Sequence, residues 1–426
     1  MPPLKPCFPE LVALTVSLAM LGVNGICHGQ QLESPDDGRV EARADDRLKG
    51  VLKFERIDDS VSPVLGDADR QEDPQSGGWD LGLIVSVAYD DNIFLSSANP
   101  VADLVVQITP RIAYVVGNAE GEEGSYVRFV YEPSGFLYVE NGADHRIDQD
   151  VTLLTGARGR KTSVEFTGNY RRRGDAIPDT GTQTDRREHA LEVRAAYSVK
   201  EKVAFELAGG AYGTDYDSAT LSSNRDQFGE AAVRYAYSPK TQVKLAYRIG
   251  RAEVDGTGDQ TFQRVTAQLA WKPREKISID LEFGAEHRTF DNGSDSYPVG
   301  ELRFDWEAMA GTKLFVRGYR REEVSAFLTG QNYRITGIAA GISQRFSDRW
   351  LGRLELGYEK ASYSQVSGPG TAGRKDEIYF VRPSVEYEVN DRFRTSYYYQ
   401  FSKDQSNLAG FGYTNHQVGV SAAYDF

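Results

Sequence analysis

Cysteine is nearly absent from this chain of 426 residues, which contains only Cys7 and Cys27. Both lie in a segment with the pattern of a secretory signal peptide, since a basic residue precedes an apolar run over 11–26 and small or polar residues follow it. We expect residues 1–29 to be removed; acylation of Cys27 is disfavoured because the bulky Ile26 precedes it. An exported chain without further cysteine has neither a disulfide framework nor a thiolate site.

Long apolar runs are also missing beyond this segment. No other stretch approaches the ~18 consecutive apolar residues that a membrane helix needs, and the mean hydropathy is −0.49. Methionine is scarce, at 3 residues, whereas Tyr, Phe and Gly number 24, 20 and 42. If the exported chain lies in a membrane, it must therefore span it as a closed β-barrel.

Alternation of apolar and polar residues fills the chain from position 79 to 426. In "HALEVRAAYSV" (189–199), Leu191 and Val193 share one face while Glu192 and Arg194 share the other. The segments 276–286 and 299–308 repeat this period of two, which is the signal of a β-strand. About ten residues with an apolar face is the signature of one transmembrane β-strand.

The connections between these segments alternate in length. Short ones include "VKEK" (199–202) and "VNDR" (389–392); longer ones rich in Gly, Ser and Asp include "TDYDSATLSSNR" from 214 and "FDNGSDSY" from 290. Outer-membrane barrels have short periplasmic turns and long extracellular loops. We therefore predict an all-β fold over 79–426: a transmembrane antiparallel up-and-down barrel of about 18 strands, with about 16 to 20 as the range.

The carboxyl end separates this fold from a soluble β-sandwich, which also produces alternation. The chain ends "QVGVSAAYDF", with apolar residues on one face and Tyr424 and Phe426 at the end. This resembles the final strand by which the barrel-assembly machinery recognises outer-membrane proteins, so we expect these two residues to form an assembly signal. The export signal and the alternating turn lengths favour the membrane barrel as well.

The stretch "VAYDDNIFL" (87–95) places Tyr89, Asp90, Asp91 and Asn92 at the outer end of the first predicted strand. An aromatic ring at the membrane boundary followed by Asp and Asn in water is typical of such an end. Two alternative roles for this motif are loose contact with a divalent cation or with lipopolysaccharide, and catalysis. The segment is not an EF-hand, because it lacks the required Gly and Glu at the sixth and twelfth positions.

The run 78–114, "GWDLGLIVSVAYDDNIFLSSANPVADLVVQITPRIAY", resembles the opening of the β-barrel porin type 2 family. In that family a first strand ends in Tyr-Asp-Asp-Asn-Ile-Phe and a second strand ends near "TPRIAY". The resemblance extends loosely over 79–426. It implies an outer-membrane barrel of porin type, often associated with exopolysaccharide export, and it implies no catalytic residues.

The polar face of the predicted strands carries many charges. Its arginines are Arg111, Arg128, Arg194, Arg234, Arg248, Arg264, Arg303, Arg317, Arg353, Arg382 and Arg394, and its interleaved acids include Glu192, Glu282, Glu301, Asp305 and Glu355. In a barrel of this size these residues line the lumen. They are candidates for a salt-bridged wall or for a path that selects an anionic solute.

The segment 30–78 is acidic and nearly free of aromatic residues, which predicts a disordered periplasmic linker that could still enter the lumen. The net charge of −13 disfavours nucleic-acid binding. No zinc spacing or phosphate-binding loop is present, so we expect no metal, no cofactor and no enzyme activity. The expected partners are outer-membrane lipid and lipopolysaccharide, the barrel-assembly machinery and polysaccharide-export components.

Three functions are compatible with these features. The first is a porin or channel for passage or export of polar solutes, an acidic exopolysaccharide among them. The second is a closed structural barrel that binds a partner through its extracellular loops. The third is an outer-membrane hydrolase, which would use His145 or His189.

Overall fold

The computed structural model describes residues 78–117, 123–291, 293–365 and 373–426. The predicted signal peptide and the linker up to residue 77 lie outside the described residues. The first strand begins at Gly78, one residue before the predicted start of the barrel. Among the described residues, no helix has the length and apolarity that a membrane-spanning helix requires.

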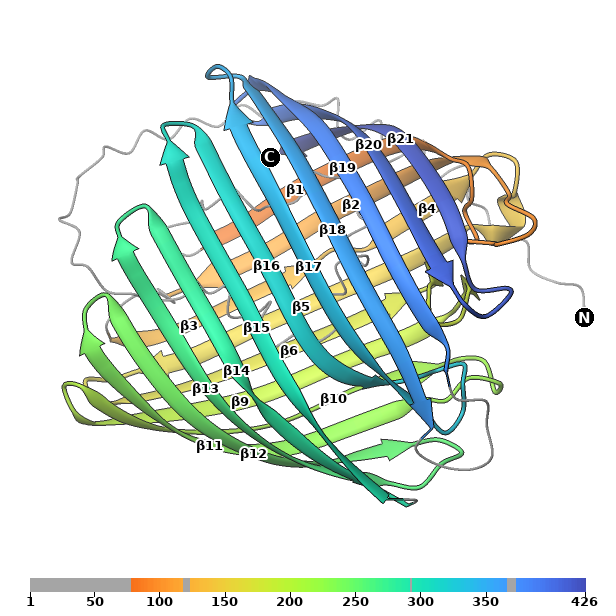
Figure 1. The fold of residues 1–426 in the computed structure, drawn as a ribbon. Helices are drawn as coiled ribbons and strands as arrows, with labels where there is room; N and C mark the ends of the chain where they lie inside the picture. The colour runs from red at the N-terminus through yellow and green to blue at the C-terminus, as the bar shows by residue number, and fades with distance from the viewer. Residues whose placement is uncertain (1–77, 118–122, 292, 366–372) are drawn as a thin grey trace, which may run out of the picture. The chain divides into compact units, whose positions relative to one another are not determined.

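Antiparallel strands form nearly all of the described chain (Figure 1). The first half comprises β1 (Gly78–Asp90), β2 (Asp103–Val116), β3 (Gly124–Tyr131), β4 (Ser134–Tyr138), β5 (Arg146–Arg158), β6 (Thr162–Arg173), β7 (Ala176–Ile177), β8 (Thr182–Gln183), β9 (Arg186–Lys200), β10 (Val203–Tyr216) and β11 (Asn224–Ser238). The second half comprises β12 (Thr241–Val254), β13 (Gln260–Arg274), β14 (Ile277–Phe290), β15 (Gly293–Met309), β16 (Thr312–Val324), β17 (Gln331–Arg345), β18 (Trp350–Gln365), β19 (Lys375–Asn390), β20 (Phe393–Ser406) and β21 (Tyr413–Asp425). A short 3₁₀ helix spans Gly142–Asp144.

The main sheet closes on itself, because β1 pairs with both β2 and β21. The strands β3 and β4 are two halves of one barrel strand, since each pairs with β2 on one side and with β5 on the other. Counted in this way, the described residues form a closed barrel of 18 antiparallel strands, which confirms the predicted fold class and strand number. The strands β7 and β8 form a separate small hairpin.

The two faces of the strands differ as the alternation predicted. On β9, Leu191, Val193 and Tyr197 are exposed, whereas Ala190 and Glu192, at the alternate positions, are buried. The same apolar exposure continues around the ring, for example at Phe205, Leu207, Leu245, Ile249, Val265, Phe283, Ile338, Leu356 and Val418. An apolar outer surface of this extent is stable in lipid and not in water.

Aromatic side chains lie on the outer surface where the strands approach the short turns. The ring centres of Trp79 and Tyr114 lie 4.8 Å apart and those of Trp350 and Tyr387 4.6 Å apart, with the rings of each pair tilted. Phe426 lies 5.0 Å from the ring of Tyr424, one of the two predicted assembly-signal residues. Aromatic rings on the outer surface near the strand ends form the girdle that anchors transmembrane barrels at the boundary between lipid and water.

One predicted loop is wrong. The segment 290–297 reads as a long connection, but β14 continues to Phe290 and β15 begins at Gly293, and these two residues pair. Beyond the membrane a hairpin needs only its backbone hydrogen bonds, so Gly, Ser and Asp do not end it. Gly293 adopts φ 141°, a value that favours glycine at this tight turn.

Candidate channel lumen and mouth

Ion pairs, most of them between neighbouring strands, cover much of the inner wall. The predicted arginines within ion-pair distance of a carboxylate include Arg111 (Asp80, 3.4 Å), Arg194 (Glu192, 2.7 Å), Arg234 (Glu206, 2.9 Å), Arg248 (Glu230, 2.7 Å), Arg264 (Glu286), Arg303 (Glu301, 2.6 Å), Arg317 (Asp305, 2.7 Å), Arg353 (Glu386, 3.1 Å) and Arg382 (Glu355, 3.5 Å). Charges of both signs therefore alternate along the wall.

The remaining predicted wall residues lie on the same face. Arg128 pairs in register with the buried Leu154, and Arg394 with the buried Ala423. Glu282 accepts a hydrogen bond from Gln268 of the neighbouring strand. The most accessible carboxylate in these pairs is Asp305, whose side chain is 49% exposed beside Arg317.

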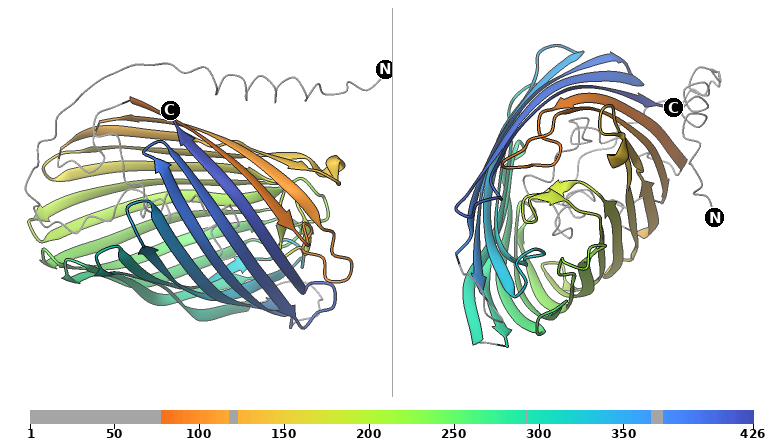
Figure 2. Two further views of the ribbon diagram at one scale, coloured as in Figure 1. Left: turned by 90° about the horizontal axis from the view of Figure 1, so that it is seen from above. Right: turned by 90° about the vertical axis from the view of Figure 1, so that its right-hand side faces the viewer.

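The connection between β6 and β9 folds into the ring of strands. It contains the β7–β8 hairpin, which Figure 2 (right) shows inside the ring in yellow-green. Asp179, between β7 and β8, is buried and accepts three hydrogen bonds: from Ser325 Oγ at 3.0 Å, Ala326 N at 2.7 Å and Tyr363 Oη at 2.9 Å. A single carboxylate thus fixes this hairpin to the β16–β17 connection and to β18.

Arg374 fastens the same hairpin from the β18–β19 connection. Its guanidinium donates to the carbonyl oxygens of Asp179 and Pro178, both at 2.8 Å, and pairs with Asp376 at 2.7 Å. It also lies 3.8 Å from the ring centre of Phe411, in the β20–β21 connection. We call Asp179, Ser325, Ala326, Tyr363, Arg374 and Phe411 the mouth cluster, because connections from the long-loop end of the barrel converge on it.

An ionised carboxylate supports the base of the inward hairpin. Asp175 lies 2.8 Å from Arg186. Burial raises the pKa of the Asp175 carboxyl, but Arg186, Arg146 and Arg173 together lower the pKa further and hold it below its ordinary value. The charge on Asp175 is therefore retained at neutral pH, and it balances the surrounding arginines.

The Tyr89–Asn92 motif lies at the long-loop end of β1, where β1 meets β21. Asp90 is buried and accepts hydrogen bonds from Asn92 N at 2.8 Å, Asn415 Nδ2 at 2.5 Å and Gln417 Nε2 at 2.6 Å. Asp91 accepts one from His416 N at 2.7 Å. The motif fastens the first strand to the last, and among the described residues no group of His, Cys, Asp and Glu is placed to hold a metal ion.

Replacing Asp90 with alanine is expected to weaken this seam. The substitution removes the carboxylate that accepts from the buried Asn415 amide and from the half-buried Gln417 amide. A buried donor that loses its acceptor costs about 1–3 kcal/mol. The heat-induced mobility shift of the folded barrel on SDS gels measures the effect, which should move to lower temperature. Asp291→Ala, at an exposed carboxylate of the same end, is the control; an equal shift in both variants would contradict this role.

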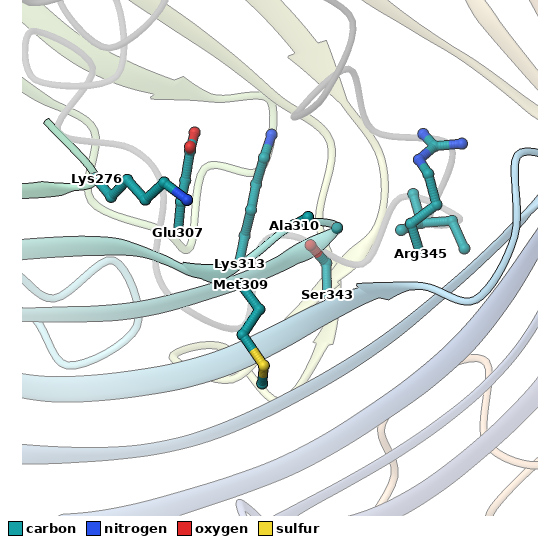
Figure 3. A pocket seen from close by; sticks show the side chains of 9 residues that line it. Lys276, Glu307, Met309, Ala310, Lys313, Ser343 and Arg345 are labelled. Atoms are coloured by element: carbon teal, nitrogen blue, oxygen red, sulfur yellow. The ribbon is translucent and has the colours of Figure 1, made fainter.

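The opposite end of the barrel carries a small hollow of about 210 Å³ beside the short turns of β14 to β18. Figure 3 shows Lys313, Glu307 and Arg345 on one side of the strands and Met309 on the other. Lys313 pairs in register with Glu307 and with Ser343. Charged side chains therefore continue along the wall to this end.

The histidines named for a hydrolase have other surroundings. His145 accepts a hydrogen bond from the backbone N of Tyr138 at 3.1 Å, and His189 lies 3.8 Å from Asp215. These two contacts, to a backbone N–H and to an aspartate, are not the histidine–serine contact that activates a nucleophile. The described contacts give the hydrolase hypothesis no support.

Comparison with known proteins yields no family model and no curated protein that matches the chain. Solved structures with a similar fold include the outer membrane protein OpdK of Pseudomonas aeruginosa (11% identity, 82% of this chain and 99% of that chain, TM-score 0.43). They also include OccK2 (OpdF) of the same organism in complex with glucuronate (9%, 83% and 100%, 0.46) and OccAB3 of Acinetobacter baumannii (9%, 82% and 99%, 0.44).

The closed ring with an apolar exterior decides the location. The chain is an outer-membrane β-barrel. Its wall residues were visible in the sequence because they follow the strand period. Its mouth cluster was not, although apolar Ile177, Phe327 and Phe411 in otherwise polar connections were a signal that these loops pack.

Proposed function

We propose that this barrel is a channel for small polar solutes across the outer membrane. The observation that carries the proposal is the lumen wall, which presents charges of both signs on an 18-strand ring. Barrels with this number of strands are wide enough for an aqueous path. The mouth cluster narrows that path at the long-loop end, which favours small solutes over a polymer.

Planar-bilayer recording tests this function. The purified barrel should produce discrete conductance steps in salt solution, and its variants without the mouth cluster contacts should do so as well. If neither shows any current, the alternative of a closed barrel that binds a partner through its long loops replaces the channel. Export of an acidic exopolysaccharide has no support from the comparisons.

We also propose that the wall arginines tune ion selectivity. Reversing both Arg303 and Arg317 to glutamate would place four carboxylates together, because each arginine already faces one, Glu301 and Asp305 respectively. The reversal potential in a salt gradient should shift toward cation selectivity. An unchanged potential would mean that these pairs lie away from the ion path; Arg187→Glu, at an outward ion pair with Asp217, is the control.

We propose that the partners of the barrel contact its outer surface. The exposed Tyr424 and Phe426 serve as the signal for the barrel-assembly machinery, and the apolar band with its aromatic girdle contacts lipid and lipopolysaccharide. Deletion of Phe426 should reduce the amount of folded barrel in the membrane without changing the conductance of the molecules that fold.

A further inference from the structure

The seam between β15 and β16 ends early. Their last pair at the long-loop end is Gly300 with Arg320. On the other side of β15, pairing with β14 continues to Gly293, and on the other side of β16, pairing with β17 continues to Val324. Among the described strands, residues 293–299 of β15 therefore have no ladder partner on the β16 side.

A proline explains where the seam ends. Proline has no backbone N–H and is tolerated in sheets at edges and bulges. The four prolines within the described strands all coincide with a break in a ladder: Pro110 beside the gap between β3 and β4, Pro273 at a register shift, Pro298 in the free part of β15, and Pro383 between the paired segments of β19 and β20. Pro298 thus marks residues 293–299 as an edge.

Beyond Arg320 the β16–β17 hairpin bends into the barrel. In the middle of β17, the face that carries the exposed Ile338 points outward. Asn332, near the start of β17, lies on that same face by the period of two. Yet Asn332 exchanges two hydrogen bonds, at 3.1 and 2.9 Å, with Gln260. Gln260 shares the inner face of β13 with the buried Phe262, so the outward face of the hairpin has turned to the inside.

The bent hairpin also covers the inner side of the free edge. The Arg334 guanidinium lies 4.5 Å from the ring centre of Tyr297 on β15 and pairs with Asp295 at 2.9 Å and with Glu322 at 3.3 Å. Asn332 Nδ2 donates to Glu322 at 2.9 Å. Polar contacts, in place of apolar packing, therefore hold the hairpin against β15.

The tip of the hairpin reaches the far side of the mouth. Ser325 and Ala326 donate to Asp179 of the β6–β9 connection, and Ala326 O accepts from Ser222 N of the β10–β11 connection at 2.8 Å. The tip is thus held by hydrogen bonds to two connections and lies across the mouth cluster.

We propose that the free edge of β15, residues 293–299, is a docking site for residues 321–327, which comprise the end of β16 and the start of the β16–β17 connection. Continuing the existing register would pair Val299 with Arg321 and Gly293 with Phe327. This occupant is favoured because the docking surface continues an interface that already exists and because the two segments are joined by the same ladder. In the docked state the tip leaves the mouth cluster, so the hairpin is a flap with two positions.

The exchange of contacts makes two positions physically reasonable. The inward position keeps the hydrogen bonds to Gln260, Asp179 and Ser222, whereas the docked position gains ladder hydrogen bonds along the free edge, less the one that Pro298 cannot donate. Two arrangements that exchange similar numbers of hydrogen bonds can both be populated. The consequence for solute passage rests on the proposed channel function; the docking itself does not.

A disulfide designed in the docked register tests the proposal. Ser296→Cys with Val324→Cys places the pair opposite each other in the continued ladder, where antiparallel Cα atoms lie about 4.5–5.5 Å apart, within disulfide range. Both native cysteines precede the described barrel. The full-length protein should form this bond on oxidation, while the control Ser294→Cys with Val324→Cys, two residues out of register, should form it far less.

The outcomes separate docking from channel function. Formation of the in-register disulfide together with a reversible rise in conductance supports both, and its formation without current in any variant supports docking while rejecting the channel. Equal cross-linking in both cysteine pairs, or none in either, overturns the docking proposal, as does cross-linking between molecules that identifies a second copy as the occupant.

A second variant keeps the proposal falsifiable if the cysteine pairs fold poorly. Pro298→Thr restores a donor to the free edge and, in the otherwise native protein, should raise the conductance without any engineered cysteine. Pro383→Thr, at the break between β19 and β20, is the matched control and should leave the conductance unchanged. Equal behaviour of the two proline variants would contradict the role of the edge.

Discussion

Replacing Asp179 with alanine is expected to open the long-loop mouth and to increase single-channel conductance. The substitution removes the acceptor shared by Ser325 Oγ, Ala326 N and Tyr363 Oη, all of which lie in the interior of the mouth. Each buried donor left without a partner costs about 1–3 kcal/mol, so the inward hairpin loses much of what holds it.

Planar-bilayer recordings of the variant and the native barrel measure this effect. Asp217→Ala is the control, because Asp217 is a carboxylate of the neighbouring β10–β11 connection that pairs with the exposed Arg187 at 3.0 Å. The control should conduct like the native barrel. If Asp179→Ala does so too, with unchanged noise and open probability, the mouth cluster does not limit the current.

Replacing Leu245 with arginine is expected to impair folding of the barrel into lipid strongly. Leu245 is 59% exposed on the outer face of β12. Its cross-strand neighbours on that face are Val233 and Ala267, and Val243 and Tyr247 flank it along the strand. A charge inside such an apolar band costs about 2–4 kcal/mol near the bilayer midplane.

Folding equilibria in lipid vesicles under denaturant report this cost directly. Ser294→Arg, at the exposed tip of the β14–β15 hairpin, carries the same charge into water and should cost close to nothing. Equal stability of the two variants, or a native chain that stays monodisperse in buffer without detergent, would show that the outer face does not contact hydrocarbon.

The alternation of apolar and polar residues predicted the barrel fold, but it did not predict the contacts between residues far apart in the sequence. The local period of two predicts that Leu191 and Glu192 lie on opposite faces of their strand. The closed barrel confirms this, since Leu191 is exposed and Glu192 is buried. The contacts of Asp179 join residues 146 to 184 positions apart, and no local period encodes them. The bend of β16–β17 was equally hidden, although Pro298 inside an alternating run was a visible sign of an edge.

The Asp90 motif shows the same limit at closer range. Its residue types predicted the end of a strand at the correct position, since β1 ends at Asp90. They did not predict that the Asp90 side chain would be buried by Asn415 and Gln417, because the strand that supplies these partners lies at the other end of the chain. Composition identifies boundary residues, whereas only closure of the ring identifies their partners.

Closure through β1 and β21 has a consequence for biogenesis. Every other strand pairing of the described barrel joins strands that follow one another around the ring and can form as each hairpin is made, but β1 pairs with β21, where Asp90 and Asn415 are 325 residues apart. The edge of β1 that pairs with β21 therefore keeps its backbone N–H and C=O groups without ladder partners until the last strand has been translated and exported. During that interval the polypeptide exposes two aggregation-prone edges, so periplasmic chaperones and the assembly machinery act on an open sheet, and a truncated product has no route to a sealed ring.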